Sequence, residues 1–226
     1  MKVLFTKKLN DKMISEKLGS HFSYDCVEVI KIHKKKISLF DLKDKSLIFT
    51  SVNGVRAFFG NGFKANENFA DWNYNKIYAV GAKTKQELRK NGFGTFKVLP
   101  YACDLSEFII ENAPNEHFLH FCGNLSLDVL DKTLPLQNVW YKKIVIYETE
   151  ILYPMIEGEY QSAVFFSPSG VRSFVKNNSL EGLTLFSIGK TTEKELKNYT
   201  DKEIYTSKNA SLDEVLTLIK DHSSTI

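Results

Sequence analysis

Short apolar runs alternate with amphipathic stretches along the whole chain. Runs rich in β-branched and aromatic residues predict strands, and the segments between them carry apolar residues at helical spacing. The predicted strands are 2–6, 27–32, 46–50, 77–80, 96–99, 117–121, 144–148, 162–166, 185–188 and 203–206. The predicted helices are 10–18, 52–60, 84–91, 105–112, 125–132, 168–177, 192–198 and 212–220. This alternation predicts an α/β protein with parallel sheets and helices on both faces.

The pattern also repeats within the chain. The stretch "SLIFTSVNGVRAFF" at 46–59 matches "SAVFFSPSGVRSFV" at 162–175, and "IYAVGAKTKQEL" at 77–88 matches "LFSIGKTTEKEL" at 185–196. The matches lie roughly 110 residues apart, which is far more than the repeat of a solenoid. We therefore expect an internal duplication that gives two small, doubly wound parallel-sheet domains.

Composition excludes several classes of protein. The 226 residues are 43% hydrophobic and 25% charged, and the net charge of +3 is too small to indicate nucleic-acid binding. The apolar run in the first residues is too short for an export signal, so none is expected, and no apolar run is long enough to span a membrane. Three well-separated cysteines favour a reducing, cytoplasmic location. His117 and His120 should lie on opposite faces of one strand, so no metal site is expected.

The turns that follow the strands carry the candidate chemistry. Ser51 and Ser167 stand at expected helix N-caps. The pairs Thr84 with Glu87 and Thr192 with Glu195 have the spacing of capping boxes. Ligands of open α/β sheets bind beyond the carboxyl ends of the strands, where helix N-termini attract anions. These turns therefore suit a ligand that carries carboxylates or phosphates.

The stretch "IGKTT" at 188–192 ends like a phosphate-binding P-loop. That motif needs a further glycine at position 184, where the chain has Thr184. A nucleotide or sugar-phosphate enzyme is therefore a weak alternative, because neither a complete glycine-rich loop nor a carboxylate pair at strand ends is visible.

Taken in order, "LIFTSVNGV", "YAVGAKT", "FCGNLSLDVL", "VIYETE", "FFSPSGV" and "SIGKTT" resemble the uroporphyrinogen-III synthase family over most of the chain. The resemblance implies two α/β domains joined by two linkers, with the active site in a cleft between them. Domain 1 would comprise 1–31 and 149–226, domain 2 would comprise 38–143, and the linkers would be 32–37 and 144–148.

The resemblance also implies a reaction. Enzymes of this family close the linear tetrapyrrole hydroxymethylbilane, which carries eight carboxylates, with loss of water and inversion of the last ring. They use neither cofactor nor metal. A monomer is expected, with transient contact with the preceding enzyme of the pathway. The alternative function is a non-catalytic, two-lobed protein that binds a polycarboxylate or tetrapyrrole.

Site residues carry over from the family position by position. Tyr147 in "VIYETE" matches the tyrosine that assists loss of the hydroxyl group. Lys7 stands where many relatives have an arginine, so it would lack a bidentate grip on a carboxylate. The expected substrate-binding residues are Thr6, Lys7, Ser51, Asn53, Thr84, Gly123, Asn124, Ser167, Ser169, Gly189 and Thr192.

Overall fold

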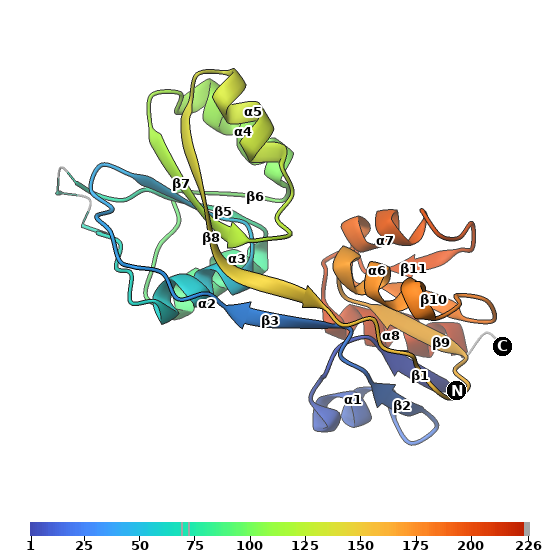
Figure 1. Cartoon of the computed structure of the whole chain (residues 1–226). Coiled ribbons are helices and arrows are strands. Elements are labelled where there is room, and N and C mark those ends of the chain that lie inside the picture. The colour runs from blue at the N-terminus through green and yellow to red at the C-terminus, as the bar shows by residue number, and fades with distance from the viewer. Residues whose placement is uncertain (69, 72, 224–226) are drawn as a thin grey trace. The chain divides into compact units, whose positions relative to one another are not determined.

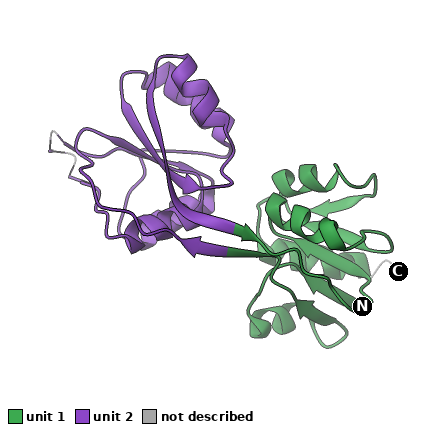
Figure 2. Cartoon of the chain, viewed as in Figure 1, with its two compact units in different colours: residues 1–31, 150–226 green, residues 32–149 purple. Residues whose placement is uncertain are grey.

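The chain folds as two compact units. The structure, a computed structural model, describes residues 1–68, 70–71 and 73–223. Unit 1 comprises Met1–Lys31 and Glu150–Ile226, and unit 2 comprises Ile32–Thr149 (Figure 2). Unit 2 is thus inserted in the sequence of unit 1.

Unit 2 is built on one sheet with helices on both faces (Figure 1). The strand order is β3 (Ile30–Lys34), β8 (Trp140–Ile151), β7 (His117–Gly123), β4 (Ser46–Phe49), β5 (Ile77–Val80) and β6 (Lys97–Leu99). From β8 to β6 all neighbours are parallel. The helices are α2 (Val52–Gly60), α3 (Ala82–Lys90), α4 (Ala102–Asn112) and α5 (Val129–Leu136).

Both faces of this sheet are buried, which explains its continuous apolar runs. Leu47 and Phe49 of β4 pack in one core with residues of α2 and α3. Ile48, which points to the other face, packs in a second core with residues of α4 and α5. Alternate residues of one strand therefore serve two cores.

Unit 1 has the same plan. Its parallel sheet runs β11 (Ile204–Thr206), β10 (Thr184–Ser187), β9 (Ser162–Phe165), β1 (Lys2–Phe5) and β2 (Ser23–Cys26). The helices α1 (Asp11–Leu18) and α8 (Leu212–Ser223) share one core. The helices α6 (Pro168–Asn177) and α7 (Lys190–Leu196) border the other.

The strand orders confirm the predicted pair of doubly wound, parallel-sheet units. In unit 1, β9, β10 and β11 extend outward on one side of β1, while β2 lies on the other side. In unit 2, β4, β5 and β6 extend outward from β7 in the same way, and β8 lies on its far side. The direction of winding therefore reverses between β1 and β9, and between β7 and β4. In open α/β sheets, ligands bind at the carboxyl ends of the strands beside such a reversal.

Three expectations from the sequence were wrong in detail. The strand expected at 27–32 does not exist as one element, because β2 ends at Cys26 and β3 begins at Ile30 in the other sheet. The helix expected at 125–132 begins only at Val129, because a turn closes first through a hydrogen bond from Ser126 N to the Gly123 carbonyl (3.1 Å). The strand expected at 144–148 is the middle of the much longer β8.

The segments that were expected to be linkers take part in strand pairing. Residues 32–34 lie in β3 and residues 144–148 lie in β8, and β3 and β8 are neighbours in one sheet. The two passages of the chain between the units are therefore hydrogen-bonded to each other as strands.

Candidate functional site

Tyr147 lies over the end of β7, at the winding reversal of unit 2. Cys122 pairs with Val145, but Gly123 pairs with Tyr147, so β8 carries one extra residue at this point. This irregularity brings the tyrosine ring directly onto Gly123. A Cβ atom at position 123 would collide with ring atoms Cε2 and Cζ and lie 2.9 Å from the hydroxyl oxygen. Glycine is therefore required here by the approach of the ring.

Ser51 joins Tyr147 to the start of α2. As the N-cap of α2, its Oγ accepts a hydrogen bond from Gly54 N at 3.0 Å. The same Oγ lies 3.0 Å from the Tyr147 hydroxyl, and either group can donate. Burial raises the pKa of the Tyr147 phenol, and the hydrogen bond with Ser51 offsets part of that rise. Tyr147 is therefore a protonated phenol near neutral pH, held by a group that can stabilise its anion.

Close packing of α2 against β7 holds this arrangement together. A Cβ atom at Gly54 would lie 2.7 Å from the carbonyl oxygen of Phe121, so only glycine allows the contact. Asn53, in the same first turn, is half-buried. The first turn of α2 is thus fixed at the edge of the sheet, and its amide groups point toward the space beyond it.

Asn124 is engaged with the backbone of β8. Its Oδ1 accepts a hydrogen bond from Thr149 N at 2.8 Å, and its Nδ2 donates to the Thr149 carbonyl at 3.4 Å. Its own N–H donates to the carbonyl of Tyr147 at 3.3 Å. The side chain expected to bind substrate therefore positions the segment that carries Tyr147.

The capping boxes expected at α3 and α7 were wrong. The helices begin earlier, with Gly81 and Gly189 as N-caps that offer no side-chain hydrogen bond. Thr84 and Thr192 are the third residues of these helices and are buried. A glycine N-cap has no side-chain oxygen, so the cap residue does not compete with an anion at these helix starts.

The glutamates of those boxes pair with arginines of the repeated S-x-x-G-V-R segment. Arg56 Nε donates to Glu87 at 2.7 Å, and Arg172 lies 3.1 Å from Glu195. The Arg56 hydrogen bond lowers the pKa of Glu87. Glu87 and Glu195 are each the sixth residue of their helix, so each arginine neutralises a carboxylate beyond the first turn of the following helix.

A buried chain of hydrogen bonds reaches the same edge from the other face of the sheet. His120, with no exposed surface, lies 2.9 Å from Thr50 Oγ1 through Nε2 and 2.7 Å from the Tyr141 hydroxyl through Nδ1. The Tyr141 hydroxyl donates to Asp131 at 2.8 Å, and Lys143 donates to the same carboxylate at 2.8 Å. The sequence did not identify this chain, although a histidine within an apolar strand must find partners.

Unit 1 presents a second group of expected residues. The Thr6 hydroxyl donates to the Val164 carbonyl at 2.7 Å, across the winding reversal of this unit. Ser167 caps α6 by accepting from Gly170 N at 3.1 Å, and its Oγ lies 3.1 Å from Ser169 Oγ. Lys7 is exposed. The backbone of Gly189 is extended, and a Cβ there would meet Ala210 at an ordinary 3.6 Å.

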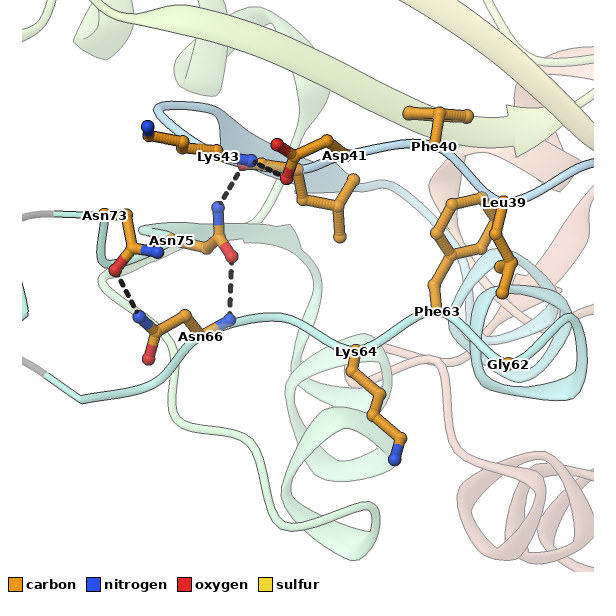
Figure 3. A pocket seen from close by; sticks show the side chains of 11 residues that line it. Leu39, Phe40, Asp41, Lys43, Gly62, Phe63, Lys64, Asn66, Asn73 and Asn75 are labelled. Atoms are coloured by element: carbon orange, nitrogen blue, oxygen red, sulfur yellow. Dashed lines mark hydrogen bonds between the residues drawn. The ribbon is translucent and has the colours of Figure 1, made fainter.

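A cavity of about 250 Å³ lies at the opposite edge of the unit 2 sheet, before β4 and β5 (Figure 3). Its asparagines bind one another and the backbone: Asn75 Nδ2 donates to the carbonyls of Leu42 (2.7 Å) and Lys45 (2.8 Å), and its Oδ1 accepts from Asn66 N (2.7 Å). These contacts fix the residues that precede β4, at the N-terminal ends of the strands, whereas Tyr147 lies at the carboxyl end of β7.

Neither a metal centre nor a membrane span is found among the described residues. Within 1–68, 70–71 and 73–223, no group of three or more His, Cys, Asp or Glu side chains is arranged to hold a metal ion. Over the same ranges, every helix is too short or too polar to cross a bilayer. Trp140 is 43% exposed and lies beside His117.

The fold and the turns define a class: a doubly wound α/β protein of two units, with helix N-termini at the carboxyl ends of its strands. The family model described as Uroporphyrinogen-III synthase HemD matches residues 26–217. The chain therefore belongs to the uroporphyrinogen-III synthase family, the cyclising hydro-lyases of haem biosynthesis. No curated protein matches the chain.

Solved structures of this family have the same fold. Uroporphyrinogen-III synthetase from Helicobacter pylori is 18% identical, with a TM-score of 0.68 over 98% of this chain and 99% of that one. A mutant synthase from the extremely thermophilic bacterium Thermus thermophilus is 16% identical, with a TM-score of 0.68 over 100% and 99% of the two chains. The wild-type Thermus enzyme in another crystal form gives 0.52 at 16% identity, over 99% and 98%.

Proposed function

We propose that this chain closes hydroxymethylbilane to uroporphyrinogen III, with Tyr147 as the general acid. The observation that carries the proposal is the hydrogen bond between Tyr147 and Ser51, held over Gly123 at the winding reversal. A phenol in this position can reach a ligand at the edge of the sheet, where α/β proteins bind their ligands.

The proposed first step is loss of water. The Tyr147 O–H gives its proton to the terminal hydroxyl of the substrate, the carbon–oxygen bond breaks, and water leaves. The electron pair of a pyrrole nitrogen stabilises the cationic methylene that remains. Ser51 then donates its hydroxyl proton in a hydrogen bond to the phenolate oxygen, which is the contact that lowers the Tyr147 pKa against the effect of burial. The ring proton that is released on closure returns to Tyr147.

The turns bind the substrate carboxylates. In unit 2, the first turns of α2 and α3 offer backbone amides together with Asn53 and Thr84, while the Ser51 hydroxyl serves Tyr147. In unit 1, the corresponding turns offer Ser167, Ser169, Gly189 and Thr192, and the segment after β1 offers Lys7. The Thr6 hydroxyl donates to the Val164 carbonyl, so Thr6 acts by holding this segment against β9. Helix N-termini bind anions through unpaired N–H groups and a positive dipole end. Gly123 and Asn124 act by placing Tyr147.

The proposal includes a cytoplasmic monomer that needs no added cofactor and takes its substrate from the preceding enzyme. The net charge of +3 favours the approach of an acidic ligand. The Arg56–Glu87 and Arg172–Glu195 pairs support the same view, since they neutralise one carboxylate each in α3 and α7.

The test is an isomer assay with two tyrosine variants. Purified protein receives fresh hydroxymethylbilane without cofactor, the products are oxidised, and the type I and type III isomers are separated by chromatography. We expect mainly type III, and we expect Tyr147→Phe to form it about 10²–10⁴-fold more slowly while it still binds product. Tyr199→Phe is the matched control, because Tyr199 is exposed after α7.

Two results would contradict the proposal. Only type I isomer, at the spontaneous rate, would indicate a tetrapyrrole-binding protein without this activity. Type III formation that is equal in Tyr147→Phe and the unaltered chain would remove Tyr147 from the mechanism and leave the activity intact.

A further inference from the structure

The chain of hydrogen bonds that ends at Thr50 has a fixed direction. Burial acts to raise the pKa of Asp131, but hydrogen bonds from Lys143 and Tyr141 outweigh it, so this pKa is lowered and the group is a carboxylate. A carboxylate only accepts hydrogen bonds. The Tyr141 hydroxyl must therefore donate to Asp131 Oδ1 and can receive only through its oxygen lone pairs.

The direction continues through His120. The Tyr141 oxygen lies 2.7 Å from His120 Nδ1, so Nδ1 carries the proton and donates. Burial lowers the pKa of His120 to about 4, so near neutral pH the ring holds one proton only. Its Nε2 is then an acceptor, and the partner at 2.9 Å, Thr50 Oγ1, must donate to it.

This direction determines what Thr50 can still bind. A threonine hydroxyl has one hydrogen and two lone pairs, and the hydrogen is committed to His120. Thr50 is half-buried, directly after β4 at the winding reversal and directly before Ser51. Thr50 therefore presents hydrogen-bond acceptors alone at an edge where the helix starts present donors.

We propose that Thr50 accepts a hydrogen bond from an N–H group of the ligand, a pyrrole N–H of the tetrapyrrole, and that His120, Tyr141 and Asp131 position it. The inference deepens the proposed function and rests on it. Carboxylates cannot bind at an acceptor, whereas a tetrapyrrole offers N–H donors between its carboxylate groups. At this edge of the sheet, Thr50 would then recognise the pyrrole rings, and the helix starts would bind the carboxylate groups.

The test compares two ligands that carry the same carboxylates. Uroporphyrinogen III, kept anaerobic, has pyrrole N–H groups, and zinc uroporphyrin III has none because its nitrogens bind the metal. We expect Thr50→Val to weaken binding of uroporphyrinogen III about 10-fold, the effect of one hydrogen bond, and to leave the affinity for the zinc complex unchanged. Thr50→Ser keeps the hydroxyl and should bind both ligands like the unaltered chain.

A second pair of variants separates positioning from folding. Thr50→Val leaves the buried His120 Nε2 without a hydrogen-bond donor, and this single variant could fail to fold for that reason. In that case the double variant Thr50→Val/His120→Leu, which removes the unsatisfied nitrogen as well, is used in its place. His120→Leu alone keeps the Thr50 hydroxyl but frees its rotation. It should raise the KM for hydroxymethylbilane about threefold without lowering kcat, a pattern that a general loss of stability does not give.

The outcomes distinguish this inference from the proposed function. Equal losses for the two ligands in Thr50→Val, or no loss for either, would overturn the role of Thr50 in a protein that still forms the type III isomer. An unaltered chain that binds neither ligand and forms only type I would overturn the proposed function, and the inference with it.

Discussion

At the scale of single residues, two glycines of the candidate site differ in what requires them. Gly123 must be glycine because the Tyr147 ring occupies the place of a Cβ. Gly189 has an extended backbone and ordinary space around it, so neither conformation nor packing within the chain requires glycine there. Packing within the protein therefore explains the glycine at position 123 and does not explain the glycine at position 189.

We expect Gly123→Ala to displace the Tyr147 ring and break its bond with Ser51. Type III formation should fall about as far as in Tyr147→Phe, that is, about 10²–10⁴-fold. Overpacking should also cost about 1–3 kcal/mol of stability. Gly189→Ala is the control: its melting temperature should stay close to that of the unaltered chain. Full activity in Gly123→Ala would contradict the importance of this contact.

A second prediction at this scale concerns pH. The pKa of His120 is lowered by burial from 6.5 to about 4 in the folded protein, among Thr50, Tyr141, Asp131 and Lys143. Between these values the unfolded chain binds a proton that the folded chain does not. The stability that depends on neutral His120 is therefore complete above about pH 6.5 and is lost as the pH falls toward about 4, by up to about 3 kcal/mol.

The measurement is the free energy of unfolding in urea at several pH values between about 7 and about 4. Carboxylates also titrate in this range, so the comparison is with His120→Gln, which cannot titrate. The unaltered chain should lose more stability than the variant on acidification. Parallel curves for the two proteins would show that His120 does not contribute to acid sensitivity.

At the scale of elements, the same ion pair joins consecutive helices in both units. Arg56 of α2 pairs with Glu87 of α3, and Arg172 of α6 pairs with Glu195 of α7. The arginine side chains are 56% and 41% exposed, so each pair contributes little to stability, about 0.2–1 kcal/mol. Each pair also neutralises a carboxylate beyond the first turn of α3 or α7.

We expect Arg56→Met to raise the KM for hydroxymethylbilane several-fold, because Glu87 then adds an uncompensated negative charge to α3, whose start is proposed to bind a carboxylate. Glu87→Gln removes the carboxylate and should leave KM unchanged or slightly lower. The difference between the variants should shrink at high salt, since exposed charges are screened over about 8–10 Å near physiological ionic strength. Equal KM values for the two variants at low salt would contradict this account.

Much of the element plan could be predicted from the sequence. The helices 52–60 and 168–177 were correct because serine N-caps and continuous buried faces specify them. The starts of α3 and α7 were not, because a glycine N-cap leaves no side-chain signal and a threonine with a glutamate imitates a capping box. The exposed Leu125 and Leu127 likewise imitated a helical face before α5.

The candidate site was only partly visible in the sequence. The segments that carry Ser51, Gly123 and Tyr147 could be named from the resemblance. The contact of Tyr147 with the other two residues depends on strand register, which the resemblance does not give. One extra residue in β8 brings Tyr147 to Ser51, across 96 positions of sequence. Local patterns do not encode such a shift. The direction of the hydrogen bonds through His120 depends on side chains from β7, β8 and α5 together. It could therefore be determined only from the structure.

At the scale of the whole molecule, each unit has its own sheet and its own cores. Unit 2 is continuous in sequence, from Ile32 to Thr149, whereas unit 1 is made of two segments. We expect the fragment 32–149 to fold without unit 1, because both of its cores are formed by its own residues. Its far-UV circular dichroism should show a cooperative thermal transition. A fragment 1–31 is the control and should be unfolded. A non-cooperative transition in 32–149 would contradict the independence of unit 2.

The insertion of unit 2 also sets an order of events during synthesis. On the ribosome, β1 and β2 emerge first, but β9, the neighbour of β1 on its other side, emerges more than a hundred residues later. Domains generally fold as units as they leave the ribosome. The first strands of unit 1 must therefore wait, with their apolar faces uncovered, while the nascent chain completes unit 2. The protein is exposed to misassembly and chaperone binding chiefly at its beginning, long before its last helix is translated.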